Sequence, residues 1–250
     1  EVDAEVVGPI RRPRLYWMTW EVCPGDLEKV NTMMGFERLV SRTDLRVPAS
    51  EFLPKGVTKG GSRPFPTAVR WIPRSKPPDT PAGIEQCSEE TLMKWQESGY
   101  AMAPYQFKKE NGVVMPDGSY RPLNADEREK LHGFKEGHTK GFPEGQRISF
   151  VGNSFHCIVA AYLFGSWAKR SGILAQMPSV KQLWSNAGYG GSYFASKEKE
   201  RKSYQLGQDL DLGDPGVHVG AGDDLGDRVT VVTEEDQSAQ TEQIYHLIQD

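Results

Sequence analysis

The 250-residue chain has few of the residues that build covalent or metal-bound scaffolds. Its three cysteines, Cys23, Cys87 and Cys157, lie far apart and include no Cys-x-x-Cys pair. Scattered cysteines in odd number argue against a disulfide framework and against a zinc site. The five histidines form no His-x-x-x-His pair, so we expect no metal. The pattern favours a reducing, intracellular compartment, which would be the nucleus in a eukaryote.

Long apolar runs are also missing. With 37% hydrophobic and 26% charged residues, the composition is that of one large or two small globular domains, and we expect no membrane partner. Residues 1–5 lack an initiator Met, a basic n-region and an apolar h-region, so they do not resemble a signal peptide. A start within a strand-like run suggests a segment of a longer polypeptide.

Positive charge is nearly absent from the C-terminal end. Residues 208–250 hold 11 Asp and Glu against the single Arg228, and the whole chain has a net charge of −4, which leaves about +6 on residues 1–207. A basic body with an acidic tail suits a nucleic-acid partner, because phosphate groups bind Lys and Arg. A mixed, solvated surface explains the same composition equally well.

The distribution of apolar residues divides the chain into four parts. Residues 1–22 carry two strand-like runs, and the second, Leu15–Trp20, is expected to be a buried strand. Residues 23–120 are rich in Pro and Gly with only small strands, whereas 121–170 are expected to be mainly helical. Residues 171–250 become Gly-rich and then acidic, which favours a flexible linker.

The strongest local signals lie near residue 120. A Pro-Asp-Gly turn between two short extended runs predicts a hairpin over 113–121. Asn124 followed by Glu127 is the pattern of a capping box, and it predicts a helix that ends at Gly133. A second helix, apolar on nearly all sides and therefore buried, is expected over 155–169.

The Gly-Asn-Ser turn at 152–154 suggests a binding site. We expect it to open the second helix, where unpaired backbone amides together with Asn153 and Ser154 would bind a carboxylate. The plain alternative is an N-cap that serves only its own helix.

Three segments together resemble the C-terminal part of a cytosine-5 DNA methyltransferase. Residues 121–134, Arg-Pro-Leu-Asn-Ala-Asp-Glu-Arg-Glu-Lys-Leu-His-Gly-Phe, are similar to the ninth conserved motif of that family, and 152–154 falls where the tenth should be. Residues 8–16, Gly-Pro-Ile-Arg-Arg-Pro-Arg-Leu-Tyr, are similar to the eighth motif, Pro-Gln-x-Arg-x-Arg, with Ile10 in place of its Gln. The order of the three motifs, and the long variable stretch between the first two, are typical of the family.

The resemblance implies an α/β fold, namely the C-terminal portion of a Rossmann-like, S-adenosylmethionine-dependent methyltransferase with an inserted, loop-rich α+β target recognition domain. Residues 1–22 would be the last strands of the methyltransferase sheet, 23–120 the recognition domain, 121–170 the helices of the ninth and tenth motifs, and 171–250 the linker. The implied activity is methyl transfer to C5 of a cytosine flipped out of double-stranded DNA, with S-adenosyl-L-methionine as cofactor.

The same resemblance implies roles for individual residues. Arg12 and Arg14 would be the paired catalytic arginines beside the flipped cytosine and its phosphate, for which a guanidinium fork is suited. Asn153 and Ser154 would bind the methionine end of the cofactor. A threonine and nearby cations would face the DNA, although a solvated surface explains the cations equally well: Lys59, Arg63, Thr67 and Arg70.

The segments that carry the chemistry in this family have no counterpart in the chain. The Phe-x-Gly-x-Gly cofactor loop, the Pro-Cys nucleophile and the Glu-Asn-Val acid all precede the eighth motif. The resemblance therefore implies an N-terminal half with motifs one to seven, either upstream or as a separate subunit, and this chain alone is predicted to be inactive. Two alternatives stay open: a non-catalytic DNA-binding module, and a segment of a mobile-element polyprotein.

Overall fold

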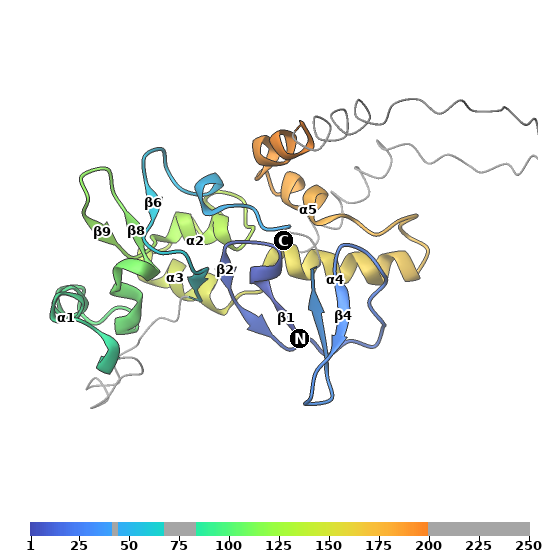
Figure 1. Cartoon of the computed structure of the whole chain (residues 1–250), viewed down its shortest axis with the longest axis horizontal. Helices are drawn as coiled ribbons and strands as arrows, with labels where there is room; N and C mark the ends of the chain where they lie inside the picture. The colour runs from blue at the N-terminus through green and yellow to red at the C-terminus, as the bar shows by residue number, and fades with distance from the viewer. Residues whose placement is uncertain (42–44, 68–83, 200–250) are drawn as a thin grey trace, which may run out of the picture.

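The computed structural model describes residues 1–41, 45–67 and 84–199, which form a mixed α/β fold (Figure 1). Its short strands build a four-stranded sheet in the order β3-β1-β5-β4, a pair of β2 and β7, and a three-stranded sheet in the order β6-β8-β9. In chain order the strands are β1 Val2–Asp3, β2 Ile10–Arg11, β3 Pro13–Arg14, β4 Glu28–Asn31, β5 Glu37–Val40, β6 Thr58–Lys59, β7 Phe65–Pro66, β8 Val113–Val114 and β9 Tyr120–Arg121.

The α-helices follow strand β7 in the chain, and residues 191–199 are helical in addition to the five labelled helices. The labelled helices are α1 Glu89–Glu97, α2 Ala125–Leu131, α3 Glu144–Asn153, α4 Cys157–Arg170 and α5 Val180–Asn186. Short 3-10 turns connect other elements: η1 Ala4–Val6, η2 Ala49–Glu51, η3 Ile84–Gln86, η4 Pro104–Phe107 and η5 Lys109–Asn111. In Figure 1, α4 lies between α5 on one side and the strands β1 and β4 on the other.

Helix α4 is the centre of the main hydrophobic core. Its residues are buried on nearly all sides, as the apolar sequence predicted, and the helix expected over 155–169 is confirmed with its start at Cys157. The hydroxyl of Tyr162 accepts a hydrogen bond from the amide of Leu27 at 3.0 Å, which ties α4 to the loop before β4. By length and composition, the helical stretch Glu144–Arg170 that α3 and α4 form could cross a membrane. However, 61% of its most apolar part is buried inside the protein, as is typical of a core helix.

The predicted hairpin near residue 120 is confirmed. Strands β8 and β9 pair antiparallel, with Val113 opposite Arg121. The amide of Gly118 donates to the carbonyl of Met115 at 2.9 Å and closes the turn. Gly118 has φ +83°, a left-handed conformation that favours glycine.

The predicted capping box of α2 is also confirmed. The amide of Glu127 donates to Asn124 Oδ1 at 2.8 Å, and the amide of Asn124 donates to Glu127 Oε2 at 2.9 Å. Arg121 reinforces the box, because its guanidinium donates to both carboxylate oxygens of Glu127 at 2.8 Å. Gly133, just beyond the helix, has φ +80°, which is typical of a helix C-terminus.

Residues 171–199 are folded, so the linker predicted from residue 171 is wrong over this stretch. Helix α5 has a capping box of its own and packs its apolar side into the main core. The indole of the fully buried Trp184 donates to the carbonyl of Val7 at 2.8 Å, across 177 residues of sequence. Residues 200–250 lie outside the described residues.

The buried strand predicted over Leu15–Trp20 does not form. Strand β3 ends at Arg14, and the residues after it have no regular secondary structure. Trp17 is 92% exposed. A strand requires a neighbour for its backbone groups, and among residues 1–41, 45–67 and 84–199 no strand pairs with this segment.

Candidate functional site

Arg12 connects the N-terminal strands to the end of α3. The residue is 3% exposed, and its guanidinium donates to the carbonyl of Gly152 at 3.0 Å and to that of Ser154. Its backbone amide donates to Asp3 Oδ1 at 2.6 Å, which fixes the chain between β2 and β3. The segment 8–16 therefore meets the Gly-Asn-Ser turn directly, across 140 residues.

The Arg12 cation is held by carbonyl dipoles. Burial, together with repulsion by Arg14, lowers the pKa of Arg12 to about 10, so it stays charged at neutral pH. The carbonyls at a helix C-terminus carry partial negative charge and stabilise a cation placed there. Within the described residues, Arg12 Nε has no hydrogen-bond partner, so the two terminal nitrogens make the contacts of this side chain.

Two buried histidines, which the sequence gave no reason to single out, lie within reach of the Arg12 charge. His132 is the C-cap of α2, His156 is the N-cap of α4, and their ring centroids are 6.0 Å apart. Burial and the charge of Arg12 lower the pKa of His156 to about 3. Burial and the neighbouring His156 hold the pKa of His132 well below its usual value. Both rings are therefore neutral at pH 7.

Acid is expected to destabilise the fold through this pair. An imidazole in the unfolded chain takes up a proton near pH 6.5, whereas folded His156 does so only near pH 3. Between these values the unfolded state binds more protons, so the free energy of unfolding falls as the pH drops from about 6.5 toward 3. Urea unfolding at pH 7.5 and 5.5 measures this loss.

Two histidine variants test whether His156 causes the loss of stability in acid. His156→Gln should lose less stability than the wild type between the two pH values. His138→Gln, which alters an exposed histidine, should behave like the wild type. Equal losses in His156→Gln and the wild type would contradict the assignment.

The Gly-Asn-Ser turn closes α3 instead of opening α4, so the predicted arrangement is wrong. Asn153 is the last residue of α3, and the amide of its C-cap, Ser154, donates to the carbonyl of Phe150 at 2.9 Å. The Ser154 hydroxyl donates to Val151 O at 2.8 Å, and the Asn153 side-chain amide donates to Ser149 O at 2.9 Å. The donors expected to hold a carboxylate are thus engaged by α3 itself.

The start of α4 is covered by α2. The amide of Cys157 donates to the carbonyl of His132 at 2.8 Å, and Cys157 is buried. This contact brings the end of residues 121–134 to the same place as the Gly-Asn-Ser turn. The turn can still offer a ligand two hydrogen-bond acceptors. They are the side-chain oxygen Oδ1 of the exposed Asn153 and the hydroxyl oxygen of Ser154. Such acceptors suit an ammonium group better than a carboxylate.

The cations predicted to face DNA lie in different settings. Lys59 Nζ donates to Gly61 O at 2.7 Å and lies 5.1 Å from the ring centroid of Phe65, and burial lowers its pKa. Arg63 is exposed. Arg70 lies outside the described residues. Of the three, Arg63 is the one whose side chain the structure shows open to a phosphate.

Thr67 joins the predicted recognition region to segment 8–16. Strand β7 runs parallel to β2, and Thr67 Oγ1 donates to the carbonyl of Arg11 at 2.6 Å. The side chain of Gln106 donates to Thr67 O at 3.1 Å. Nearby, Arg14 is exposed, and its guanidinium donates at 2.8 Å to the carbonyl of Pro13, its own neighbour. The remaining N–H groups of Arg14 are open to a ligand.

The described residues thus define a mixed α/β protein with a buried arginine at the junction of three distant segments. A scan against protein-family models and a search of curated proteins each found no match. In the part of the chain that the structure describes, no group of three or more His, Cys, Asp or Glu is placed to hold a metal ion.

Proposed function

We propose that this chain is the C-terminal portion of a cytosine-5 DNA methyltransferase, which recognises double-stranded DNA and completes the S-adenosylmethionine site. The observation that carries the proposal is the contact of Arg12 with Gly152 and Ser154. It joins the eighth-motif and tenth-motif segments, and the bond from Cys157 to His132 adds the ninth. A chance resemblance gives no reason for three such distant segments to converge.

The arrangement of the elements agrees with this proposal. The four-stranded sheet with α4 would be the edge of a Rossmann-like methyltransferase sheet. Strands β6, β8 and β9 with α1 would belong to the target recognition domain. In Figure 1 these last elements lie together at one end of the molecule, away from β4. The pairing of β2 with β7 would then set the orientation of the recognition domain.

The two arginines would have different tasks. The guanidinium of Arg12 is engaged by carbonyls of the Gly-Asn-Ser turn, so we assign Arg12 as a positioning residue. The exposed Arg14 would be the one that binds the flipped base or its phosphate, because a guanidinium fork can donate to either.

The turn fits one end of the cofactor. Asn153 Oδ1 and Ser154 Oγ can accept hydrogen bonds from the ammonium group at the methionine end of S-adenosylmethionine. When bound, the cofactor supplies the methyl group. The nucleophilic cysteine would come from the half that carries motifs one to seven. The chain would therefore contribute half of the cofactor site and the means of holding DNA.

The chain alone is expected to transfer no methyl group to a cytosine-containing duplex. Mixed with a polypeptide that carries motifs one to seven, it should catalyse transfer from radiolabelled S-adenosyl-L-methionine. In that mixture Arg14→Ala should lower the rate about 100-fold or more, as expected for loss of a donor to the reacting group. The control is Arg170→Ala, which alters an exposed arginine at the far end of α4.

Methylation by the isolated chain would contradict the proposal. Duplex binding without methyl transfer in the mixture would favour the non-catalytic DNA-binding module instead. The reading frame upstream of Glu1 offers an independent test, because a Pro-Cys and a Glu-Asn-Val there favour the enzyme. A polymerase or nuclease domain following Asp250 would favour the mobile-element polyprotein.

A further inference from the structure

Five cations lie along a stripe where distant segments of the chain meet. Residues 59–63 run against η5, because the amide of Gly60 donates to the carbonyl of Gly112 at 3.0 Å. Strand β7 follows directly and pairs with β2, which leads into β3. These segments carry the cations of what we call the basic stripe: Lys109, Lys59, Arg63, Arg11 and Arg14.

The charge of the basic stripe is only partly compensated. In the part of the chain that the structure describes, four of its five cations form no ion pair: Lys59, Arg63, Lys109 and Arg14. The fifth, Arg11, meets Asp3 at the long distance of 4.0 Å, and its side chain is 70% exposed. Glu110 adds one carboxylate within η5. All of the cations except Lys59 are exposed, so the stripe is open to a polyanion.

The chain also carries a segment of the opposite charge. Residues 208–250 hold 11 Asp and Glu against Arg228, whereas residues 1–207 have a net charge of about +6. At up to about 3.3 Å per residue, the 51 residues after Lys199 span at most roughly 170 Å. A domain of about 200 residues has a radius of gyration of roughly 16 Å, so the segment is long enough to reach any face of the protein. Because it belongs to the same molecule, its encounter with the stripe is intramolecular and is favoured over that of a separate polyanion of equal charge.

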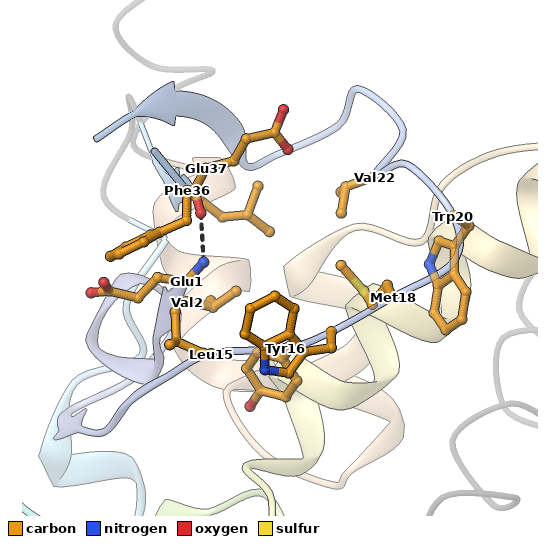
Figure 2. Close-up of a pocket in the computed structure, with 11 residues that line it drawn as sticks. Glu1, Val2, Leu15, Tyr16, Met18, Trp20, Val22, Phe36 and Glu37 are labelled. Carbon is orange, nitrogen blue, oxygen red and sulfur yellow. Dashed lines mark hydrogen bonds between the residues drawn. The ribbon is translucent and has the colours of Figure 1, made fainter. Parts of the chain in front are cut away.

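Two hollows outside the stripe do not suit an acidic segment. Figure 2 shows one of them, of about 250 Å³, where Glu1 and Glu37 lie among apolar side chains. The other, of about 510 Å³, is lined by Glu21, which already pairs with its two cations, Lys29 and Arg170. Carboxylates in both hollows would repel those of an acidic segment. The basic stripe is therefore the better match in charge.

We propose that residues 208–250 bind the basic stripe and compete with DNA for it. The inference rests on the proposed function, because Arg14 and Arg63 are among the residues expected to hold DNA. Carboxylates and phosphates accept the same charge-assisted hydrogen bonds from a guanidinium. Contacts with phosphates supply essentially all of non-specific DNA binding. The acidic segment would therefore act mainly against non-specific duplex, whereas a duplex with the target sequence binds more tightly and would displace it.

Cross-linking of the full chain tests the contact without DNA. A zero-length carbodiimide joins a lysine to a carboxylate only where the two touch, and peptide mass spectrometry locates the link. Lys109 should link to residues 208–250, whereas Lys140, an exposed lysine outside the stripe, should not. An excess of a duplex of random sequence should remove the links. Links that are as frequent at Lys140 as at Lys109 would overturn the inference.

Duplex affinity, followed by fluorescence anisotropy, tests the competition. Replacing the 11 acidic residues of 208–250 by Asn and Gln should tighten binding of the random duplex by about 10-fold or more at low salt, because the stripe is then open in every molecule. High salt should remove the difference. The control is a shuffled 208–250 that keeps its charges, and it should behave like the wild type. In a chain with Arg14→Ala and Arg63→Ala, neutralisation should have a smaller effect, as expected for groups that interact.

The outcomes separate the inference from the proposed function. A duplex affinity that rises on neutralisation, without methyl transfer when the motif one-to-seven polypeptide is added, would support the inference and count against the enzyme. Methyl transfer with equal duplex affinities of the wild type and the neutral variant would keep the enzyme and overturn the inference. A neutralisation effect of the same size with and without the two arginines would indicate repulsion at a distance and overturn the proposed contact. Failure of every variant to bind duplex would overturn both.

Discussion

Replacing Glu129 by Ala is expected to lower the free energy of unfolding by about 3–5 kcal/mol. The Glu129 side chain is fully buried and accepts hydrogen bonds from Arg147 Nη2 at 2.8 Å, the amide of Gly137 at 3.0 Å and the hydroxyl of Thr139. The amide of Thr139 also donates to Glu129 Oε1 at 3.1 Å. Truncation therefore leaves the Arg147 guanidinium and three loop donors without their shared acceptor inside the protein. Urea unfolding followed by tryptophan fluorescence measures the loss.

Asp126→Ala is the matched control for Glu129→Ala. Asp126 accepts from the same guanidinium of Arg147, but its side chain is 53% exposed. Both carboxylates raise the pKa of Arg147, and Asp126 contributes the larger hydrogen-bond effect. Water screens the exposed pair, so the control should cost less than about 1 kcal/mol. A larger loss in Asp126→Ala than in Glu129→Ala would contradict this account of burial.

Trp184→Ala is expected to cost about 3–5 kcal/mol, the range found when a large buried aromatic is truncated. The ring packs with centroids 5.1 Å from Phe52 and 5.7 Å from His156, and its indole N–H holds the carbonyl of Val7. The variant loses these packing contacts and leaves the carbonyl unpaired. Thermal and urea unfolding both report the change.

Two comparisons show where the Trp184 effect comes from. Trp184→Phe keeps an aromatic ring but removes the indole donor, so it should cost about 1–3 kcal/mol, the penalty for one unsatisfied buried group. Trp17→Ala removes a 92% exposed indole and should stay within about 0.5 kcal/mol of the wild type. Equal losses at Trp184 and Trp17 would show that α5 does not belong to the core.

The sequence predicted those features that depend on neighbours along the chain. Asn124 and Glu127 lie three residues apart, so their capping box needs no tertiary partner to be recognised. The Pro-Asp-Gly turn and the apolar run of α4 are local in the same sense. Helix α3 was missed because it includes Gly145 and Gly152, residues with low helix propensity.

Features that depend on distant partners could not be predicted. The Gly-rich sequence beyond Gly172 resembles a linker. Trp184 is recognisable as a core residue only from its contact with the distant Val7, which the sequence does not indicate. Leu15–Trp20 has strand propensity, yet a strand forms only where another strand bonds to it. At the candidate site, the bonds from Arg12 to two backbone carbonyls could not be predicted. Every residue has a backbone carbonyl, so the sequence does not indicate which of them accept from Arg12.

The bond between Trp184 and Val7 has a consequence for synthesis of the protein. Chains emerge from the ribosome N-terminus first and at about 5–20 residues per second. Trp184 is 177 positions after Val7, so strands β1 and β2 are synthesised roughly ten seconds or more before the tryptophan that covers them. During that interval β1, β2 and the aromatic segment after β3 present apolar surface to other nascent chains. We therefore expect a chaperone that shields residues 1–20 to improve the yield of this protein more than one that acts on the completed chain.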